Sequence, residues 1–511
     1  MSQEDAVQDQ VTLYESSTQL ATLTTLPRTD SRGGQEVTST YIDEIVPILN
    51  LSDCEEEHLT NLFYSNFHPA HPILVPRTFY RKEAVPRYLR LVICFVGSHY
   101  ATGRHSRDSL APVVAQAMTS TIDCTASRVQ ALVLYTIVLH ASHQAREASS
   151  CISEAAKLAI DIGLDRPSFA TDMAPHDLRQ QESLRRIWYE LYIVDGYMAA
   201  LSRQPSFRSN SVGTHPYLPC EDSLYARGVC DLHPRSLAQF DDRVFATAPC
   251  TFSSYCYRID AIRIIARVLA VAGANDACPD EVQAVDNAIA SWKYHLPSNK
   301  ADVIDQYGNV DHMLFQANVF IQWATILLHF PRSDLPMTVP TDENLACAKD
   351  LPRISATSAQ HTVKAVAASK ELSNLAALPW CVTVHSPFFT CGLILACIVQ
   401  LSACSSHART CLQQHRDRVT LMIGALKTLG KTWAVARNAL QHLMKVAHNI
   451  FCTQSAGSSP VVCSSVHDSG IGLDSIPGDM SWFDLFSLDE LSGGVPMGFG
   501  LGSGPLESAA A

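Results

Sequence analysis

The sequence predicts an all-α fold: a large multi-helix domain between a disordered N-terminal leader and a disordered C-terminal tail. Within residues 41–453, apolar side chains recur mostly at helical spacing, as in the run Leu184, Ile187, Trp188, Leu191 and Tyr192. Alternation of the β type is scarce. Helix stop signals follow the apolar runs, because Gly163 comes directly after one run, and Pro205 and Pro331 lie just past two others. These features predict about a dozen helices or more.

Residues 1–40 form the predicted leader. They are rich in Ser, Thr, Gln and acidic residues and have little apolar periodicity, so they bury too little surface to fold alone. The first ten residues, MSQEDAVQDQ, have neither the charged nor the apolar part of a signal peptide. The chain has 17 cysteines without short regular spacing. This cysteine usage indicates a reducing intracellular compartment.

Bulk composition excludes two classes of protein. The chain has 511 residues, 47% of them hydrophobic, and a formal net charge of -12. A negative chain is a poor free-standing nucleic-acid binder, so DNA affinity is expected to come from a partner.

The apolar run 388–404 is shorter than the roughly 20 residues that cross a bilayer. It also carries Thr390, Gln400 and Ser402, so no membrane span is expected.

Within the helical region, three arginine side chains are expected to have structural roles. Arg185 and Arg186 lie on a predicted helix whose Trp188 faces inward, and they are expected to pair with Glu or Asp on neighbouring helices. Arg166 follows a helix end and is expected to satisfy its last carbonyls. Contact with an effector is the alternative role for each arginine. The proline-rich connections 202–235 and 331–352 are predicted to cross the surface.

Several blocks in this region resemble, in order, the regulatory domain of fungal transcription factors that carry an N-terminal binuclear zinc cluster. This domain is called the middle homology region or the xylanolytic-activator type. The matching blocks are Leu62–Phe79 (LFYSNFHPAHPILVPRTF), Ala155–Pro167 (AAKLAIDIGLDRP), Glu182–Pro205 (ESLRRIWYELYIVDGYMAALSRQP), Phe330–Arg332, Ser386–Phe389 (SPFF) and Ala425–Ala434 (ALKTLGKTWA). The resemblance implies a helical regulatory domain over 41–453, transcription regulation in the nucleus, and control by effectors or partners. It supplies no ligand residues and implies no cofactor.

The chain departs from this family in its cysteines. A binuclear zinc cluster needs six cysteines in two halves that each begin with Cys-x2-Cys. The first cysteine here is Cys54, and no Cys-x2-Cys pair occurs in the sequence. No metal site is therefore expected in this chain. Two explanations stay open: the cluster was lost and DNA is reached through a partner, or it is missing from the gene model.

Residues 454–511 form the predicted disordered tail. They contain no Lys or Arg, seven acidic residues and ten of the chain's 23 glycines. One segment, 480–491 (MSWFDLFSLDEL), alternates acidic with apolar residues, and the apolar set is Trp482, Phe483, Leu485, Phe486, Leu488 and Leu491. Such a segment folds as a short amphipathic helix when a coactivator offers an apolar groove with a basic rim. The alternative is a helix docked on the protein's own core.

The resemblance implies a regulator of transcription, with a metabolic or secondary-metabolite gene cluster as its expected target, and the acidic-aromatic segment 480–491 predicts that it is an activator. The expected partners are coactivators and a second subunit, either a second copy or a zinc-cluster transcription factor. A scaffold or corepressor is one alternative. An all-α enzyme is another, with Asp241 and Asp242 as the best candidate for a magnesium-binding acidic motif. However, Phe245 stands where a third Asp should be, and other catalytic motifs are missing, so no enzyme is expected.

Overall fold

The computed structural model describes residues 51–103, 105–245, 251–272, 278–336, 358–378, 384–406 and 412–455. These residues contain sixteen α-helices, α2 to α17. Their only β pairing is an isolated antiparallel bridge between Ile304 and Val310. The predicted all-α fold is therefore confirmed. The leader 1–40 and the segment 480–491 lie outside the described residues.

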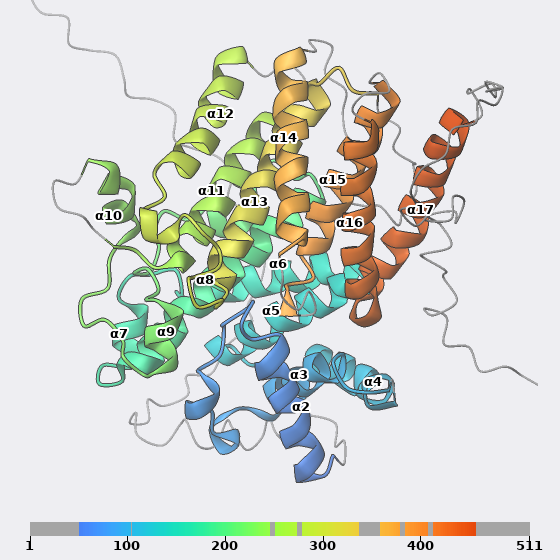
Figure 1. Ribbon diagram of the computed structural model, residues 1–511. Coiled ribbons are helices and arrows are strands. Elements are labelled where there is room, and N and C mark those ends of the chain that lie inside the picture. Colours follow the sequence, from blue (N-terminus) through green and yellow to red (C-terminus); the bar gives the residue numbers. More distant parts are fainter. Residues whose placement is uncertain are drawn as a thin grey trace, which may run out of the picture.

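The first layer consists of three helices, drawn in blue in Figure 1: α2 (Asp53–Asn66), α3 (Arg87–Ser98) and α4 (His105–Ser120). α2 starts at a capping box, in which the Ser52 hydroxyl accepts a hydrogen bond from the Glu55 amide and the Glu55 carboxylate accepts one from the Ser52 amide. Short 3-10 turns connect α2 to α3 at Arg77–Phe79 and Lys82–Ala84.

The second layer crosses the middle of the molecule (Figure 1) and comprises α5 (Ala126–Ala141), α6 (Ala145–Asp161), the short α7 (Phe169–Met173) and α8 (Leu178–Leu201). α6 ends where the sequence predicts, because Gly163 takes a φ of 80° and the Leu164 amide donates to the Ala159 carbonyl. α8 is enclosed, since every residue from Gln181 to Ala200 is buried. Trp188 faces inward as predicted, but so do all the other side chains of residues 181–200.

The connection 202–235 corrects the sequence prediction. It was expected to cross the surface, but it contains the 3-10 turn Arg208–Asn210 and α9 (Asp222–Ala226). It also buries seven side chains: Phe207, Ser209, Pro216, Leu218, Pro219, Cys220 and Tyr225. These anchors fall at irregular intervals and sustain neither a helical nor a β period. Periodicity analysis therefore cannot detect them.

The remaining helices form an array in the upper part of Figure 1, and from α11 to α17 each contacts the next along the chain. They are α10 (Leu237–Asp241), α11 (Ser254–Ala272), α12 (Pro279–Tyr294), α13 (His312–His329), α14 (Ala359–Ala376), α15 (Phe389–Ser406), α16 (Leu412–Thr432) and α17 (Ala434–Ser455). Further 3-10 turns occur at Asp242–Val244, Ser298–Lys300 and Phe330–Arg332. One apolar core runs from Leu59 in α2 to Ala447 in α17.

One helical stretch, His312–Arg332, is long and apolar enough to cross a membrane by length and composition. Its most apolar window is 94% buried inside the protein. It packs against α11, α12, α14 and α15. These contacts are those of a central core helix.

Candidate functional site: a buried charge network along α8

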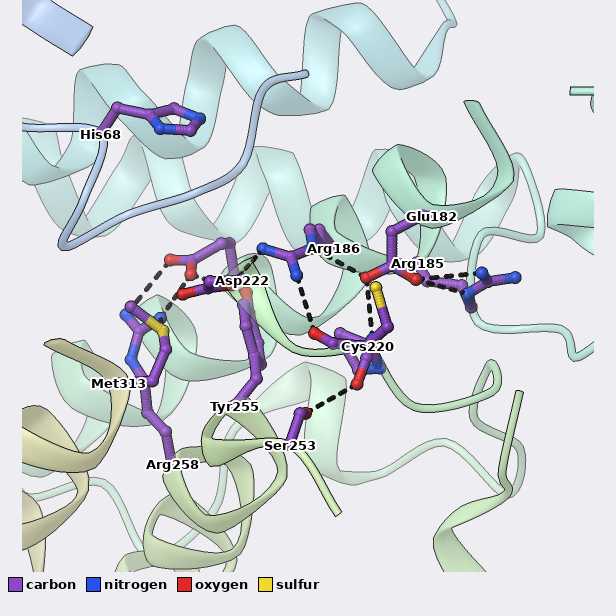
Figure 2. A network of polar contacts seen from close by, with 12 residues as sticks. His68, Glu182, Arg185, Arg186, Cys220, Asp222, Ser253, Tyr255, Arg258 and Met313 are labelled. Carbon is purple, nitrogen blue, oxygen red and sulfur yellow. Dashed lines mark hydrogen bonds and ion pairs between the residues drawn. The ribbon is translucent and has the colours of Figure 1, made fainter. Parts of the chain in front are cut away.

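Four charged side chains of α8 are almost completely enclosed in the protein: Glu182, Arg185, Arg186 and Glu190. Each is exposed by no more than 1% of its surface. An unpaired charge in such a place costs several kcal/mol, so each must find partners. Figure 2 shows the resulting network, which runs from Arg185 past Arg186 to Arg258.

Glu182 is the first acceptor of the network. Its Oε2 accepts from Arg185 Nη2 at 3.0 Å, and its Oε1 accepts from Arg186 Nε at 2.8 Å. The same Oε1 accepts the backbone amide of Cys220 at 2.9 Å. Burial alone would raise the pKa of Glu182, but the two guanidinium groups outweigh it and lower the pKa below its usual value.

Arg186 joins α8 to the connection 202–235. Its Nη1 donates to Asp222 Oδ1 at 2.6 Å, and its Nη2 donates to the Cys220 carbonyl at 2.8 Å. The Tyr225 ring lies 4.2 Å from the guanidinium carbon, within the range of a cation–π contact. Arg186 thus contacts two side chains of α9 and one carbonyl of the chain just before α9, and it fixes all three in place.

Glu190 is the second acceptor, two turns further along α8. It accepts the Tyr255 hydroxyl at 2.6 Å, pairs with Arg258 of α11, and accepts His71 Nδ1 at 3.2 Å. Burial raises the pKa of Glu190, but Arg258 and His71 together lower it to about 2. The carboxylate is therefore ionised throughout the physiological range.

His71 extends the network to a fourth part of the chain. Because its Nδ1 donates to a carboxylate, its Nε2 accepts the Ser386 hydroxyl, at 2.9 Å. Burial lowers the pKa of His71, which favours the neutral ring. Ser386 lies just before α15, and its hydroxyl oxygen accepts the Phe388 amide. The network thereby fastens the turn after α2, α8, α11 and the start of α15 to one another.

A cleft of about 900 Å³ lies beside the network. Asp222 lines it, so one carboxylate contacts both Arg186 and the cleft. The other wall is the loop around the bridge at Ile304 and Val310. Lys300 neutralises part of this acidic surface by pairing with Glu221 at 2.5 Å and lying 3.5 Å from Asp311. The cleft offers polar side chains to a ligand.

Among the described residues, no group of three or more His, Cys, Asp or Glu side chains is placed to hold a metal ion. Asp241, the first acidic residue of the considered magnesium motif, pairs through both carboxylate oxygens with Arg263, at 2.7 and 3.0 Å. The ionised groups of the network likewise bind one another. This arrangement fastens α8 to α9, α11 and the start of α15, and it fixes the positions of the buried charged side chains.

The structure places the sequence-predicted residues as follows. Arg186 pairs with Asp222 of the neighbouring helix α9, as predicted. Arg185 and Arg186 also share Glu182 of α8 itself, at the three- and four-residue spacing that brings helix side chains together. Trp188 is fully buried. Arg166 is exposed beside Gly163 and is not part of the network. The six apolar side chains of the predicted activation segment lie outside the described residues.

Sequence reasoning missed the second half of the network, namely Glu190, Tyr255, Arg258 and Ser386. One signal was available, because Arg258 directly follows the aromatic and apolar residues Tyr255, Cys256 and Tyr257 near the start of α11. A charge within a buried helix implies a buried partner. His71, in the turn after α2, is hydrogen-bonded through both ring nitrogens, to Glu190 and to Ser386.

Comparison with known proteins agrees with the resemblance seen in the sequence. Residues 60–227, which include the blocks up to the end of α8 and most of the charge network, match the fungal specific transcription factor domain. The chain is 30% identical over 404 residues to the C6 finger domain transcription factor iacK of Pestalotiopsis fici, covering 78% of this chain and 60% of that protein. No solved structure matches the chain. Residues 60–227 are therefore similar to the fungal specific transcription factor domain, and most of the chain is similar to a C6 finger domain transcription factor.

Proposed function

We propose that this protein is a nuclear transcription regulator whose helical region, residues 41–453, is its regulatory domain. The observation that carries the proposal is the 30% identity over 404 residues to a C6 finger domain transcription factor. The chain spans about 60% of the length of that relative, so the similarity concerns only part of it. The paired, buried charges of α8 support a regulatory role, since they fix the positions of segments and leave little freedom for proton transfer.

The tail is proposed to make the protein an activator. Its segment 480–491 combines aromatic and acidic residues in the pattern that coactivator grooves bind. The target is proposed to be a metabolic or secondary-metabolite gene cluster. The helical domain is proposed to pair with a second copy or with a zinc-cluster transcription factor, which brings it to promoter DNA.

A fusion experiment tests the activation step. Residues 454–511 are joined to an unrelated DNA-binding domain, and transcription of a reporter with the matching site is measured. Activation above the DNA-binding domain alone supports the activator. A silent fusion, or one that lowers transcription, supports the scaffold or corepressor instead.

A second experiment tests the route to DNA. Chromatin occupancy of the tagged protein is mapped in cells, and the purified chain is then titrated with the recovered DNA at physiological salt. We expect occupancy without intrinsic binding. Tight, sequence-specific binding by the purified chain would overturn the proposed delivery by a partner.

A further inference from the structure

A cavity of about 330 Å³ lies where four parts of the chain meet: the turns between α2 and α3, the start of α3, and the beginnings of α5 and α8. Because four segments supply its lining, the cavity forms only when the domain is folded. Its volume falls in the lower part of the range that is typical of small-molecule sites. It is distinct from the 900 Å³ cleft, since the two share no lining residue.

Much of the lining is apolar. It contains aliphatic and aromatic side chains from the turns after α2 and from α3: Leu74, Val75, Phe79, Tyr80, Val85 and Leu89. The guanidinium of Arg179 stacks on the Phe79 ring, with its carbon 4.4 Å from the ring centroid. A Cβ atom on Gly228 would come within 2.7 Å of the same ring, so the chain just after α9 packs directly against it. The apolar wall is therefore held in a fixed position.

Gln130, near the start of α5, adds a buried polar group to the lining. The residue is 7% exposed, and its amide Nε2 donates to the Ile73 carbonyl at 2.9 Å. Because a carbonyl accepts and cannot donate, this contact fixes the orientation of the amide group. The other amide atom, Oε1, accepts no hydrogen bond within the described part of the chain. A buried acceptor of this kind favours a ligand that brings an O–H or N–H group.

The charged side chains of the lining are Arg81, Asp177 and Arg179. Asp177 is engaged at the N-terminus of α8, where its Oδ1 accepts the backbone amides of Arg179 and Gln180 at 3.0 and 3.1 Å. Arg179 Nε lies 3.9 Å from the same oxygen. Arg81 is exposed and has no ion pair within the described residues. Two positive side chains and one negative one leave a net charge of +1, which favours an anionic ligand group.

We propose that this cavity binds a small, largely apolar carboxylic acid that also carries a hydroxyl or amino donor, as phenolic acids do. The ligand carboxylate pairs with the guanidinium groups of Arg81 and Arg179, its apolar body packs against Phe79, and its donor reaches Oε1 of Gln130. Arg179 fills two roles, because a guanidinium stacks through its face and donates from its edge. This inference concerns binding alone and does not rest on the proposed function.

The test measures binding of three probes to the purified full chain by ligand-detected NMR titration, with thermal unfolding as a second readout. The probe p-coumarate carries the carboxylate, the apolar body and a phenolic donor. Cinnamate lacks the donor, and p-coumaramide lacks the negative charge. We expect p-coumarate to bind with a Kd of about 1 mM or tighter and to raise the unfolding temperature. Each of the other probes should bind about fivefold to tenfold more weakly.

Three variants locate the site. Arg81 is exposed, so Arg81→Ala should keep the fold and weaken p-coumarate binding about tenfold, while p-coumaramide binds as before. Gln130→Met should remove the difference in affinity between p-coumarate and cinnamate. Arg146→Ala is the matched control, because Arg146 is exposed on α6 and lies outside the cavity lining. Its loss should change none of the three affinities.

Two outcomes would overturn the proposal. One is the absence of saturable p-coumarate binding up to about 10 mM. The other is an Arg81→Ala protein that is folded by circular dichroism and binds p-coumarate as tightly as the unchanged chain. If Gln130→Met unfolds, the comparison of p-coumarate with cinnamate on the unchanged chain still tests the donor, and equal affinities contradict it.

Discussion

At the scale of single residues, the buried negative charge of Glu190 is compensated by neighbouring side chains. Three side chains from outside α8 donate to its carboxylate: His71, Tyr255 and Arg258. A fully buried ion pair is weak evidence for stability by itself, because desolvation offsets most of the attraction. Removing one partner of such a pair is strongly destabilising, since the remaining charge stays buried without compensation.

We therefore expect Glu190→Gln to lower the free energy of unfolding by about 3–5 kcal/mol, because the Arg258 guanidinium loses its counter-charge in the core. The matched control is Glu57→Gln. Glu57 pairs with Arg77 at the surface, with side-chain exposures of 59% and 35%. That change should cost less than about 1 kcal/mol. Urea unfolding of both variants measures the difference, and equal losses would contradict the buried role of Glu190.

At the scale of elements, the packing of α2 on α3 depends on one small residue. A Cβ atom placed on Gly97 of α3 would lie 2.0 Å from the Leu59 carbonyl oxygen of α2. No side-chain rotation relieves such a contact, because the obstacle is backbone. The two helices can approach this closely only while position 97 is glycine.

Gly97→Ala should consequently destabilise the protein, although alanine is the better helix former. Gly424, within α16, provides the opposite case, because a Cβ there meets nothing within 4 Å. Gly424→Ala should raise stability by about 0.5–1 kcal/mol. Thermal unfolding distinguishes the two. A neutral or stabilising effect of Gly97→Ala would show that α2 and α3 are further apart than described.

The elements also show which features the sequence predicts and which it does not. The end of α6 at Gly163 and the burial of Trp188 follow from local pattern and turn chemistry, and both are confirmed. The partners of Glu190 lie 65 to 119 positions away along the chain. No periodicity encodes such pairings, since they arise only when helices assemble. The buried anchors of 202–235 were missed for the same reason.

At the scale of the whole molecule, a decrease in pH lowers stability through several buried ionisable side chains at once. Burial lowers the pKa of His68, His99 and His329 to about 4, and that of His385 to about 3. A histidine in the unfolded chain titrates near 6.5, so below that pH the unfolded state binds more protons than the folded state. Stability must fall as the pH decreases from about 6.5 towards 4. Glu190 continues the loss between about 4.5 and 2, as its carboxylate is protonated.

The urea midpoint should therefore drop steeply between about pH 6.5 and pH 4. Each buried histidine contributes up to about 1.4 kcal/mol per pH unit in that range. His99→Phe tests one contribution, because phenylalanine can keep the stacking on Trp433, where the ring centroids are 5.1 Å apart, and cannot titrate. This variant should show a shallower pH slope. A midpoint that stays constant from neutral pH to about pH 5 would contradict neutral, buried histidines.

If the molecule is divided as proposed into a packed regulatory domain and an activating tail, substitutions of Trp188 and Trp482 should have opposite effects on protein abundance and on transcription. Trp188 is fully buried in α8, so Trp188→Ala should cost about 3–5 kcal/mol and lower the abundance of the protein. The pair Trp482→Ala and Phe486→Ala should abolish reporter activation and leave abundance unchanged, because these side chains are proposed to bind a coactivator and not the core. Immunoblotting and reporter transcription, measured in the same cells, separate the two effects. Loss of abundance in the tail variant would favour the alternative in which 480–491 docks on the protein's own core, and retained activation would remove the proposed role of that segment.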